Sequence, residues 1–213
     1  MSSFQPQFSL RDYLGYLMPG VVSLAIHVVW NPLVIQFLKD NPLASSIIIL
    51  VGGYLMGHIC KAIGTTLFLP LRRRSRWNPY KNAFDETGKR WTVEFTKSLR
   101  AKLEAAWGKD LIEQELEFRA SNIILLCWYD TLQHPSKGHD EIDRYVSLFN
   151  LSLSLIPAFI GLAIISLIKG QWVIMILASA GVLTFAKYWY EYEFAFCSNI
   201  LRVWYTQSRS DSK

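Results

Sequence analysis

The stretch YVSLFNLSLSLIPAFIGLAIISLI, from Tyr145 to Ile168, is 24 residues long and contains no charged side chain. A helix needs about 20 apolar residues to cross the roughly 30 Å hydrocarbon core of a bilayer. Beyond Lys169, a second uncharged run of 17 residues extends from Gly170 to Ala186 and leads into the aromatic segment 188–190, whose composition suits the membrane interface. These two runs predict two transmembrane helices joined by a short hairpin.

Two further uncharged runs lie upstream. Tyr13–Leu38 spans 26 residues and Asn41–Cys60 spans 20, so we expect four transmembrane helices. The alternative is a soluble bundle with buried central helices, which we disfavour because core helices rarely stay uncharged over such lengths. The composition, 51% hydrophobic and 18% charged residues, excludes a disordered chain, a collagen-like chain and a disulfide scaffold.

Lysine and arginine are unevenly distributed along the chain. The segment Arg72–Arg144 holds 14 of the 22 basic residues, whereas the two predicted hairpins hold one lysine each, Lys39 and Lys169. Basic residues concentrate on the cytoplasmic side of membrane proteins. Both termini and the central segment are therefore expected in the cytoplasm.

These patterns predict an all-α fold: a polytopic membrane protein with four transmembrane helices and a helical cytoplasmic domain. The cytoplasmic domain would combine the insert between spans two and three with a C-terminal extension of span four. The expected division is 1–71 for the N-terminal segment and spans one and two, 72–144 for the insert, 145–190 for spans three and four, and 191–213 for the stalk and tail.

Local patterns add detail to this outline. Pro19 predicts a kink or break in the first span, because proline removes a helical hydrogen bond. Helices are expected over 92–107, over 111–133 and over 140–168. In the C-terminal extension, one helical stripe is expected to contain Tyr188, Tyr192, Ala195, Asn199 and Val203.

The clearest functional signal is the segment RRRSRWNPYK, Arg72–Lys81. Arginine makes bidentate contacts with phosphate, and aromatic rings stack on bases. The same composition also suits anionic lipid at the inner leaflet and the topology itself. The candidate ligand-binding residues are Arg72, Arg73, Arg74, Arg76, Trp77, Tyr80 and Lys81.

Gly53 and Gly57 form a small-xxx-small pair in the second span. This spacing lets helix backbones approach closely. It predicts a packing seam, either within the chain or between subunits.

No constellation for catalysis or metal binding is evident. The four spans contain no aspartate or glutamate, and their ionisable groups besides cysteine are His27, His58 and Lys61. The cluster around His134 and His139 matches no metal-ligand spacing. We therefore expect no catalytic residue, no metal and no cofactor, and three cysteines imply no disulfide framework.

Three segments carry a resemblance to a known group of proteins: FSLRDYLGYLMPG (Phe8–Gly20), GYLMGH (Gly53–His58) and the aromatic end of span four. In layout the chain resembles small bacterial four-helix membrane effectors of anti-phage defence, such as CRISPR-accessory proteins and effectors of the Hailong type. The resemblance implies an oligomeric pore in the bacterial inner membrane, whose opening depolarises the membrane and stops phage replication. It carries no site residue over to this chain.

The leading hypothesis is a non-enzymatic, homo-oligomeric pore gated by a nucleotide or oligonucleotide at the basic cytoplasmic surface. The main alternative is a non-catalytic scaffold or regulator in the membrane that recruits a cytoplasmic protein partner. A membrane enzyme that uses His58, His134 or His139, and a transporter, are weaker alternatives.

Overall fold

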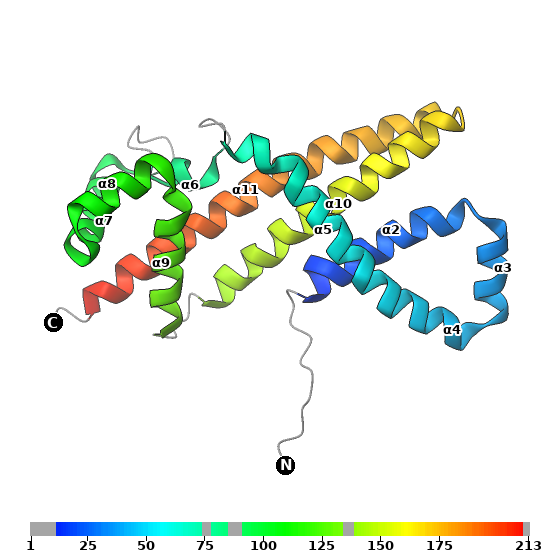
Figure 1. The fold of residues 1–213 in the computed structure, drawn as a ribbon, viewed down its shortest axis with the longest axis horizontal. Helices are drawn as coiled ribbons and strands as arrows, with labels where there is room; N and C mark the ends of the chain where they lie inside the picture. Colours follow the sequence, from blue (N-terminus) through cyan, green and yellow to red (C-terminus); the bar gives the residue numbers. More distant parts are fainter. Residues whose placement is uncertain (1–11, 74–77, 85–90, 134–138, 211–213) are drawn as a thin grey trace, which may run out of the picture. The chain divides into compact units, whose positions relative to one another are not determined.

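A computed structural model of the chain describes residues 12–73, 78–84, 91–133 and 139–210. Within these ranges every regular element is a helix, which confirms the predicted all-α class. In chain order (Figure 1) they are the π-helix η1 (Tyr13–Leu17), α2 (Met18–Val29), α3 (Pro32–Asp40), α4 (Pro42–Ile47), the π-helix η2 (Ile48–Gly52), α5 (Gly53–Arg73), α6 (Pro79–Asn82), α7 (Val93–Trp107), α8 (Lys109–Phe118), α9 (Ala120–Gln133), α10 (His139–Ile168) and α11 (Trp172–Ser210).

Within the described ranges, three helical stretches are long and apolar enough to cross a membrane: Pro42–Pro70, Asp140–Ile168 and Trp172–Gln207. The first apolar run of the sequence is divided instead. Asn31 caps α3 through a hydrogen bond from the Val34 amide to its side chain, 3.4 Å, so α2 and α3 are separate helices. Tyr13–Ile26 is a shorter apolar helix.

The chain divides into two compact units. The first comprises Met1–Leu69 with Val146–Tyr192, and the second comprises Pro70–Tyr145 with Glu193–Lys213. Helices α10 and α11 each contribute residues to both units. We call the first unit the apolar unit and the second the helical unit.

Within the apolar unit, α2 crosses α5 at backbone contact (Figure 1). A Cβ atom on Gly57 would overlap the carbonyl oxygen of Tyr16, and one on Gly20 would overlap that of Gly53. Glycine is required at such crossings because any side chain would force the helices apart. The glycine face that holds Gly53 and Gly57 is thus occupied within the chain.

The chain stays helical through Pro19, so the expected break is absent. Pro19 has no N–H to give to the carbonyl of Gly15, four residues earlier. That carbonyl instead accepts a hydrogen bond from the Ser154 hydroxyl of α10, 3.2 Å, and the π-turn of η1 precedes the proline. In an apolar surrounding, a neighbouring serine can satisfy a carbonyl that proline leaves open.

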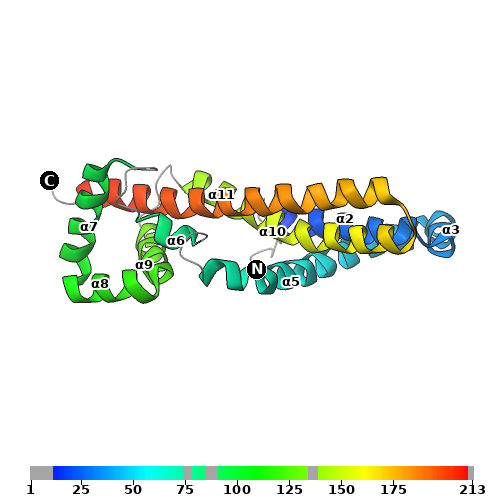
Figure 2. The same cartoon turned by 90° about the horizontal axis from the view of Figure 1, so that it is seen from above.

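In the same unit, the later half of α10 runs beside the first half of α11, as Figure 2 shows in yellow and orange. The side chain of Phe159 packs on Gly181, where a Cβ atom would come within 2.7 Å of its ring. The rings of Phe159 and Phe185 stack with centroids 5.4 Å apart. Small and aromatic residues therefore interlock to hold the hairpin together.

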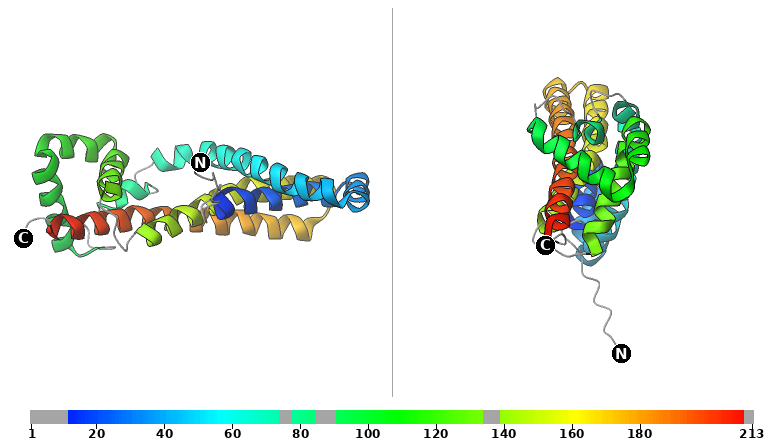
Figure 3. Two further views of the ribbon diagram at one scale, coloured as in Figure 1. Left: turned by 90° about the horizontal axis from the view of Figure 1, so that it is seen from below. Right: turned by 90° about the vertical axis from the view of Figure 1, so that its left-hand side faces the viewer.

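The helical unit has its own hydrophobic core, to which α7, α8, α9 and the end of α11 contribute (Figure 3). Trp204 of α11 is 3% exposed and stacks on Trp107 of α7 with ring centroids 5.1 Å apart. Its indole N–H donates to the Asp130 carboxylate of α9, 2.7 Å. The buried residues of this core are Ala83, Leu99, Leu103, Ile112, Ile123, Ile124, Cys127, Ile142, Phe194, Cys197, Ile200, Leu201 and Trp204.

The single helix expected over 111–133 is wrong, because the chain bends at Arg119 between α8 and α9. The amide of Asn122 donates to the carbonyl of Arg119, 2.7 Å, and its side chain donates to Glu115, 2.8 Å. The bend lets Ile112 of α8 and Ile123 of α9 pack into the same core. A single straight helix would not bring both side chains to that core.

The five residues expected on one stripe of the C-terminal extension lie along the continuous helix α11, but they do not form its buried face. Tyr188 is 41% exposed, and the other four members are only partly buried. The buried face is instead formed by Trp189, Glu193, Cys197, Ile200, Leu201 and Trp204. This buried face includes Glu193, whose carboxylate accepts a hydrogen bond from Tyr80 that is described below.

Candidate functional site

The short helix α6 sets the direction of Tyr80 and Lys81. The side-chain oxygen of Asn78 accepts from the amides of both residues, 3.1 Å each, and Pro79 occupies the first turn. Asparagine followed by proline is a favoured helix start, because the cap satisfies open amides and proline has none to satisfy. The Asn78-Pro79 pair therefore fixes the backbone of α6, from which the side chains of Tyr80 and Lys81 point in different directions.

Tyr80 points into the helical unit. Its hydroxyl donates to the carboxylate of Glu193, 2.9 Å, and Glu193 is fully buried on α11. The Tyr80 ring packs against the hydrophobic core. In this structure Tyr80 joins α6 to α11 rather than presenting a free ring for base stacking.

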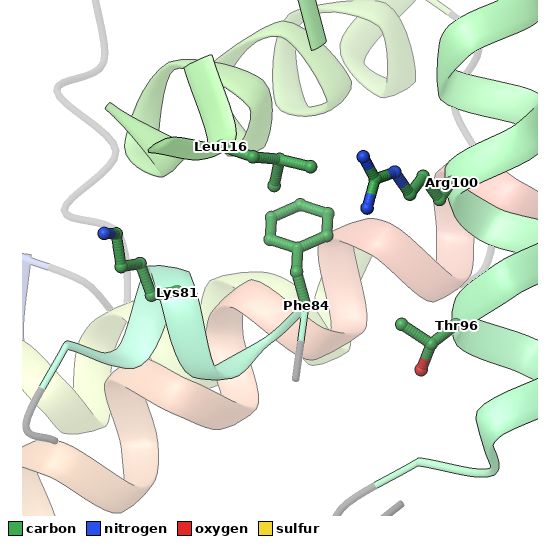
Figure 4. A pocket seen from close by; sticks show the side chains of 5 residues that line it. All are labelled: Lys81, Phe84, Thr96, Arg100 and Leu116. Atoms are coloured by element: carbon green, nitrogen blue, oxygen red, sulfur yellow. The ribbon is translucent and has the colours of Figure 1, made fainter. Parts of the chain in front are cut away.

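Lys81 points the other way and lines a cavity of about 260 Å³ together with Phe84, Thr96, Arg100 and Leu116. Figure 4 shows Phe84 in the middle of this group, with Lys81 on one side and Arg100 on the other. The residues come from α6 and the turn after it, from α7 and from α8. We call this the cationic cavity.

The Arg100 guanidinium is oriented by two carboxylates. Its Nε lies 2.9 Å from Glu104 and its Nη2 lies 3.5 Å from Glu113, with the side chain 37% exposed. A guanidinium has five N–H donors in a fixed plane. These two contacts orient the plane and offset part of the positive charge.

The chemistry of the cationic cavity suits an anion that carries a flat or apolar group. Lys81 and Arg100 supply positive charge. The hydroxyl of Thr96 donates to the carbonyl of Thr92, 3.3 Å, and its oxygen can still accept a hydrogen bond. The ring of Phe84 and the side chain of Leu116 supply an apolar surface. Pockets that bind small ligands combine such an apolar lining with a few placed polar groups.

Most of the ligand-binding residues predicted from the sequence are not placed here. Arg72 and Arg73 belong to the last turn of α5, but their side chains lie outside the described part of the chain. Arg74, Arg76 and Trp77 lie outside the described residues altogether. Among those of the seven predicted residues whose side chains the structure describes, Lys81 lines the cationic cavity and Tyr80 packs against the core.

Among the residues that the structure describes, no three metal-ligating side chains converge. The side chains of His27 and His139 are not described, and His134 lies outside the described ranges. His58 lies in the apolar unit, stacked on Tyr16.

Sequence reasoning missed Phe84, Thr96, Arg100 and Leu116. These residues share no motif, because three separate elements bring them together. The one available signal was the apolar spacing of α7: Leu99 and Leu103 mark its buried face, to which Thr96 also belongs, and Arg100 lies next to Leu99. Such a pattern locates a face but does not identify a ligand site.

Compared with known proteins, the sequence matches no family model. No curated protein and no solved structure matches it either.

Cys127 provides a pH-dependent prediction for the helical unit. Burial raises the pKa of this thiol, and the nearby carboxylate of Asp130 raises it further. The folded protein therefore keeps the proton when the unfolded chain, with a thiol pKa of about 8.5, has lost it. This contribution to stability is complete below pH 8.5 and declines above it, by about 1.4 kcal/mol for each pH unit.

Thermal unfolding of the wild type and of Cys127→Ala, measured from pH 7 to pH 10, tests this. The wild type should lose more stability than the variant between pH 8.5 and pH 10. Equal losses in the two proteins would contradict the buried, protonated thiol.

Proposed function

We propose that the chain crosses a bacterial inner membrane four times, with both termini and the helical unit in the cytoplasm. The fourth crossing would be made by η1 and α2, from Tyr13 to Val29, whose rise of about 25 Å approaches the thickness of the hydrocarbon core. The positions of Lys39 and Lys169 in two lysine-poor hairpins support this orientation. If the N-terminus is cytoplasmic and the hairpin that holds Lys39 lies outside the cell membrane, the helix between them must cross the membrane.

The spans also leave large apolar side chains exposed. Among them are Leu50, Leu55 and Ile59 on the η2–α5 stretch, and Ile176 and Leu183 on α11. In water, exposed apolar area on this scale is unfavourable, at about 25 cal/mol per Å². Lipid or neighbouring subunits would cover it, which supports membrane insertion and leaves room for a homo-oligomer.

Within the membrane, the protein would form an oligomeric ion-conducting pore that depolarises the cell in anti-phage defence. The layout resemblance to defence effectors supports this role. The absence of aspartate and glutamate from the uncharged runs also favours a pore over a proton-coupled transporter, which needs buried carboxylates. The alternative role is a non-conducting scaffold that recruits a cytoplasmic protein.

The signal would be a nucleotide, or one nucleotide of an oligonucleotide, in the cationic cavity. Lys81 and Arg100 would contact phosphate and Phe84 would stack on the base; the predicted segment Arg72–Lys81 would hold further phosphates. The observation that carries the gating proposal is the continuity of α10 and α11 through both units. A ligand that binds the open and closed states unequally shifts the gate.

The test measures K⁺ efflux from proteoliposomes with AMP, ATP, cyclic di-AMP and oligodeoxyadenylates as probes. At least one probe should change the efflux rate. Its apparent affinity should be about 100-fold weaker or more in Lys81→Ser/Arg100→Gln, because two charged hydrogen bonds of about 1.5–3 kcal/mol each are lost.

The matched control is Lys97→Ser/Arg119→Gln, which removes a lysine and an arginine from exposed positions of the same unit. It should respond as the wild type does. If both double variants respond to the probe with the same apparent affinity, the cavity is not the binding site. If no probe changes the rate of K⁺ efflux, nucleotide gating is wrong.

A further inference from the structure

A second group of polar side chains lies in the apolar unit, where η1 crosses α5. The ring of Tyr16 stacks on His58, with centroids 3.9 Å apart and planes at 16°. Tyr54 meets the same imidazole edge-on at 4.7 Å. The Gly57 contact with the Tyr16 backbone brings the helices close enough for this stacking. With Lys61, these side chains form what we call the Tyr16–Lys61 cluster.

Lys61 completes the cluster from the next turn of α5. Its ammonium donates to the Tyr16 hydroxyl, 2.7 Å, and lies 4.7 Å from the centre of the Tyr16 ring. In the described part of the chain, no carboxylate forms an ion pair with Lys61; ion pairs there involve Arg100, Lys109 and Lys187. Lys61 is therefore a half-buried cation whose contacts are one phenol and its ring.

The cluster lies at one end of the apolar helices. Tyr16 belongs to the first turns of the shorter apolar helix Tyr13–Ile26. Lys61 lies roughly 28 Å along the helix from Pro42, where the long stretch through α5 begins. That distance is about the thickness of a hydrocarbon core. Tyr16, at the start of its helix, and Lys61, one membrane thickness along the other helix, therefore meet at the depth expected for lipid headgroups.

A cation at this depth requires an anion or water, since charged groups in membrane proteins are paired or reach the interface. We propose that the Tyr16–Lys61 cluster binds the phosphate of an anionic phospholipid headgroup. Lys61 has two N–H donors beyond the one given to Tyr16. The Tyr16 oxygen accepts that bond, so its own hydrogen is available to a phosphate oxygen.

The surroundings also fit a lipid. His58 is exposed and can present a ring N–H beside Lys61. One turn deeper on α5, Leu55 is 58% exposed, and Ile59 beside it is 53% exposed. An acyl chain attached to a headgroup at His58 and Lys61 would lie along these two side chains. Free phosphate would use the polar part of the cluster and leave this apolar surface uncovered.

The inference requires η1 and α5 to lie in a bilayer but requires neither a pore nor a nucleotide. Its test titrates delipidated protein in detergent with phosphatidylglycerol, phosphatidylcholine or inorganic phosphate, and counts bound molecules by native mass spectrometry. The wild type should bind phosphatidylglycerol in preference to phosphatidylcholine. Lys61→Gln should weaken phosphatidylglycerol binding about fivefold, the effect of one basic residue at a membrane surface.

Lys169→Gln is the matched control, because Lys169 also lies over an aromatic ring, that of Trp30 at 4.5 Å, and belongs to a hairpin outside the cluster. It should bind phosphatidylglycerol as the wild type does. Tyr16→Phe keeps the stacked ring and should weaken binding about threefold through loss of one hydrogen bond. Lys61→Arg keeps the charge and should bind as the wild type does. If Lys61→Gln does not fold, Tyr16→Phe serves as the variant with weakened binding.

Two results would overturn the proposal. One is equal loss of binding in Lys61→Gln and Lys169→Gln, or no loss in Lys61→Gln and Tyr16→Phe. The other is full competition by millimolar inorganic phosphate, which would assign the cluster to a free anion. Loss of nucleotide-dependent efflux with intact lipid binding would contradict the proposed function alone.

Discussion

Gly57→Ala is expected to destabilise the protein by about 3 kcal/mol, the upper end of the usual cost of overpacking. The added methyl group would overlap the carbonyl oxygen of Tyr16, which is backbone and cannot rotate away. Helices η1 and α5 would have to separate, and the Tyr16–His58 stack would be lost with them. Gly20→Ala should behave alike, because its methyl group would overlap the carbonyl oxygen of Gly53.

The matched control is Gly161→Ala on α10. No atom lies within 4 Å of the Cβ position there, and alanine is the better helix former by about 1 kcal/mol. Thermal unfolding in detergent should show midpoints about 5–10 °C lower for Gly57→Ala and unchanged or higher for Gly161→Ala. Similar midpoints for the two variants would contradict the close crossing.

Trp204→Ala is expected to unfold the helical unit, at a cost of about 3–5 kcal/mol. The substitution removes a nearly fully buried ring, its stacking on Trp107 and its hydrogen bond to Asp130. Since α7, α9 and α11 meet at this ring, little of the void can be filled by local rearrangement.

Tyr129→Ala on α9 is the control, because Tyr129 is 63% exposed and surface substitutions usually change stability by less than about 0.5 kcal/mol. Circular dichroism during heating should show an early loss of helicity in Trp204→Ala and none in Tyr129→Ala. A single transition at the wild-type temperature in both would show that Trp204 does not hold the unit together.

Much of the helical architecture follows from where charge is absent. The uncharged runs before Lys61 and on both sides of Lys169 predicted long apolar helices, and the structure has three that could cross a membrane. In the first run, the pair Asn31-Pro32 is a helix-start signal in the sequence. A new helix, α3, begins there, which leaves the shorter α2.

In the helical unit, tertiary contacts decided two features that the sequence pattern did not show. The bend at Arg119 exists because α8 and α9 enter one core, and no glycine or proline marks it. Glu193 is buried because Tyr80 donates to it from more than a hundred positions away. Local periodicity contains neither fact, so the buried face of α11 could not be predicted from its own residues.

The candidate site shows the same limit. Lys81 was identified because it follows a conspicuous run of arginines. Arg100 was not identified. Glu104 lies one turn away on α7 and Glu113 lies on α8, so in the sequence Arg100 looks like a member of an ordinary surface ion pair. The assignment of segments to the two sides of the membrane, and the ligand-binding role of Arg72–Lys81, remain predictions.

The most direct test of the proposed function is K⁺ efflux from liposomes that contain the purified full-length protein, compared with liposomes that contain the Gly57→Ala variant. An oligomeric pore that requires a folded apolar unit predicts rapid efflux through the wild type, modulated by a nucleotide or oligonucleotide probe, and little through the variant, in which this unit is destabilised. Folded, inserted wild-type protein that passes no K⁺ with any probe would contradict the pore and favour the scaffold.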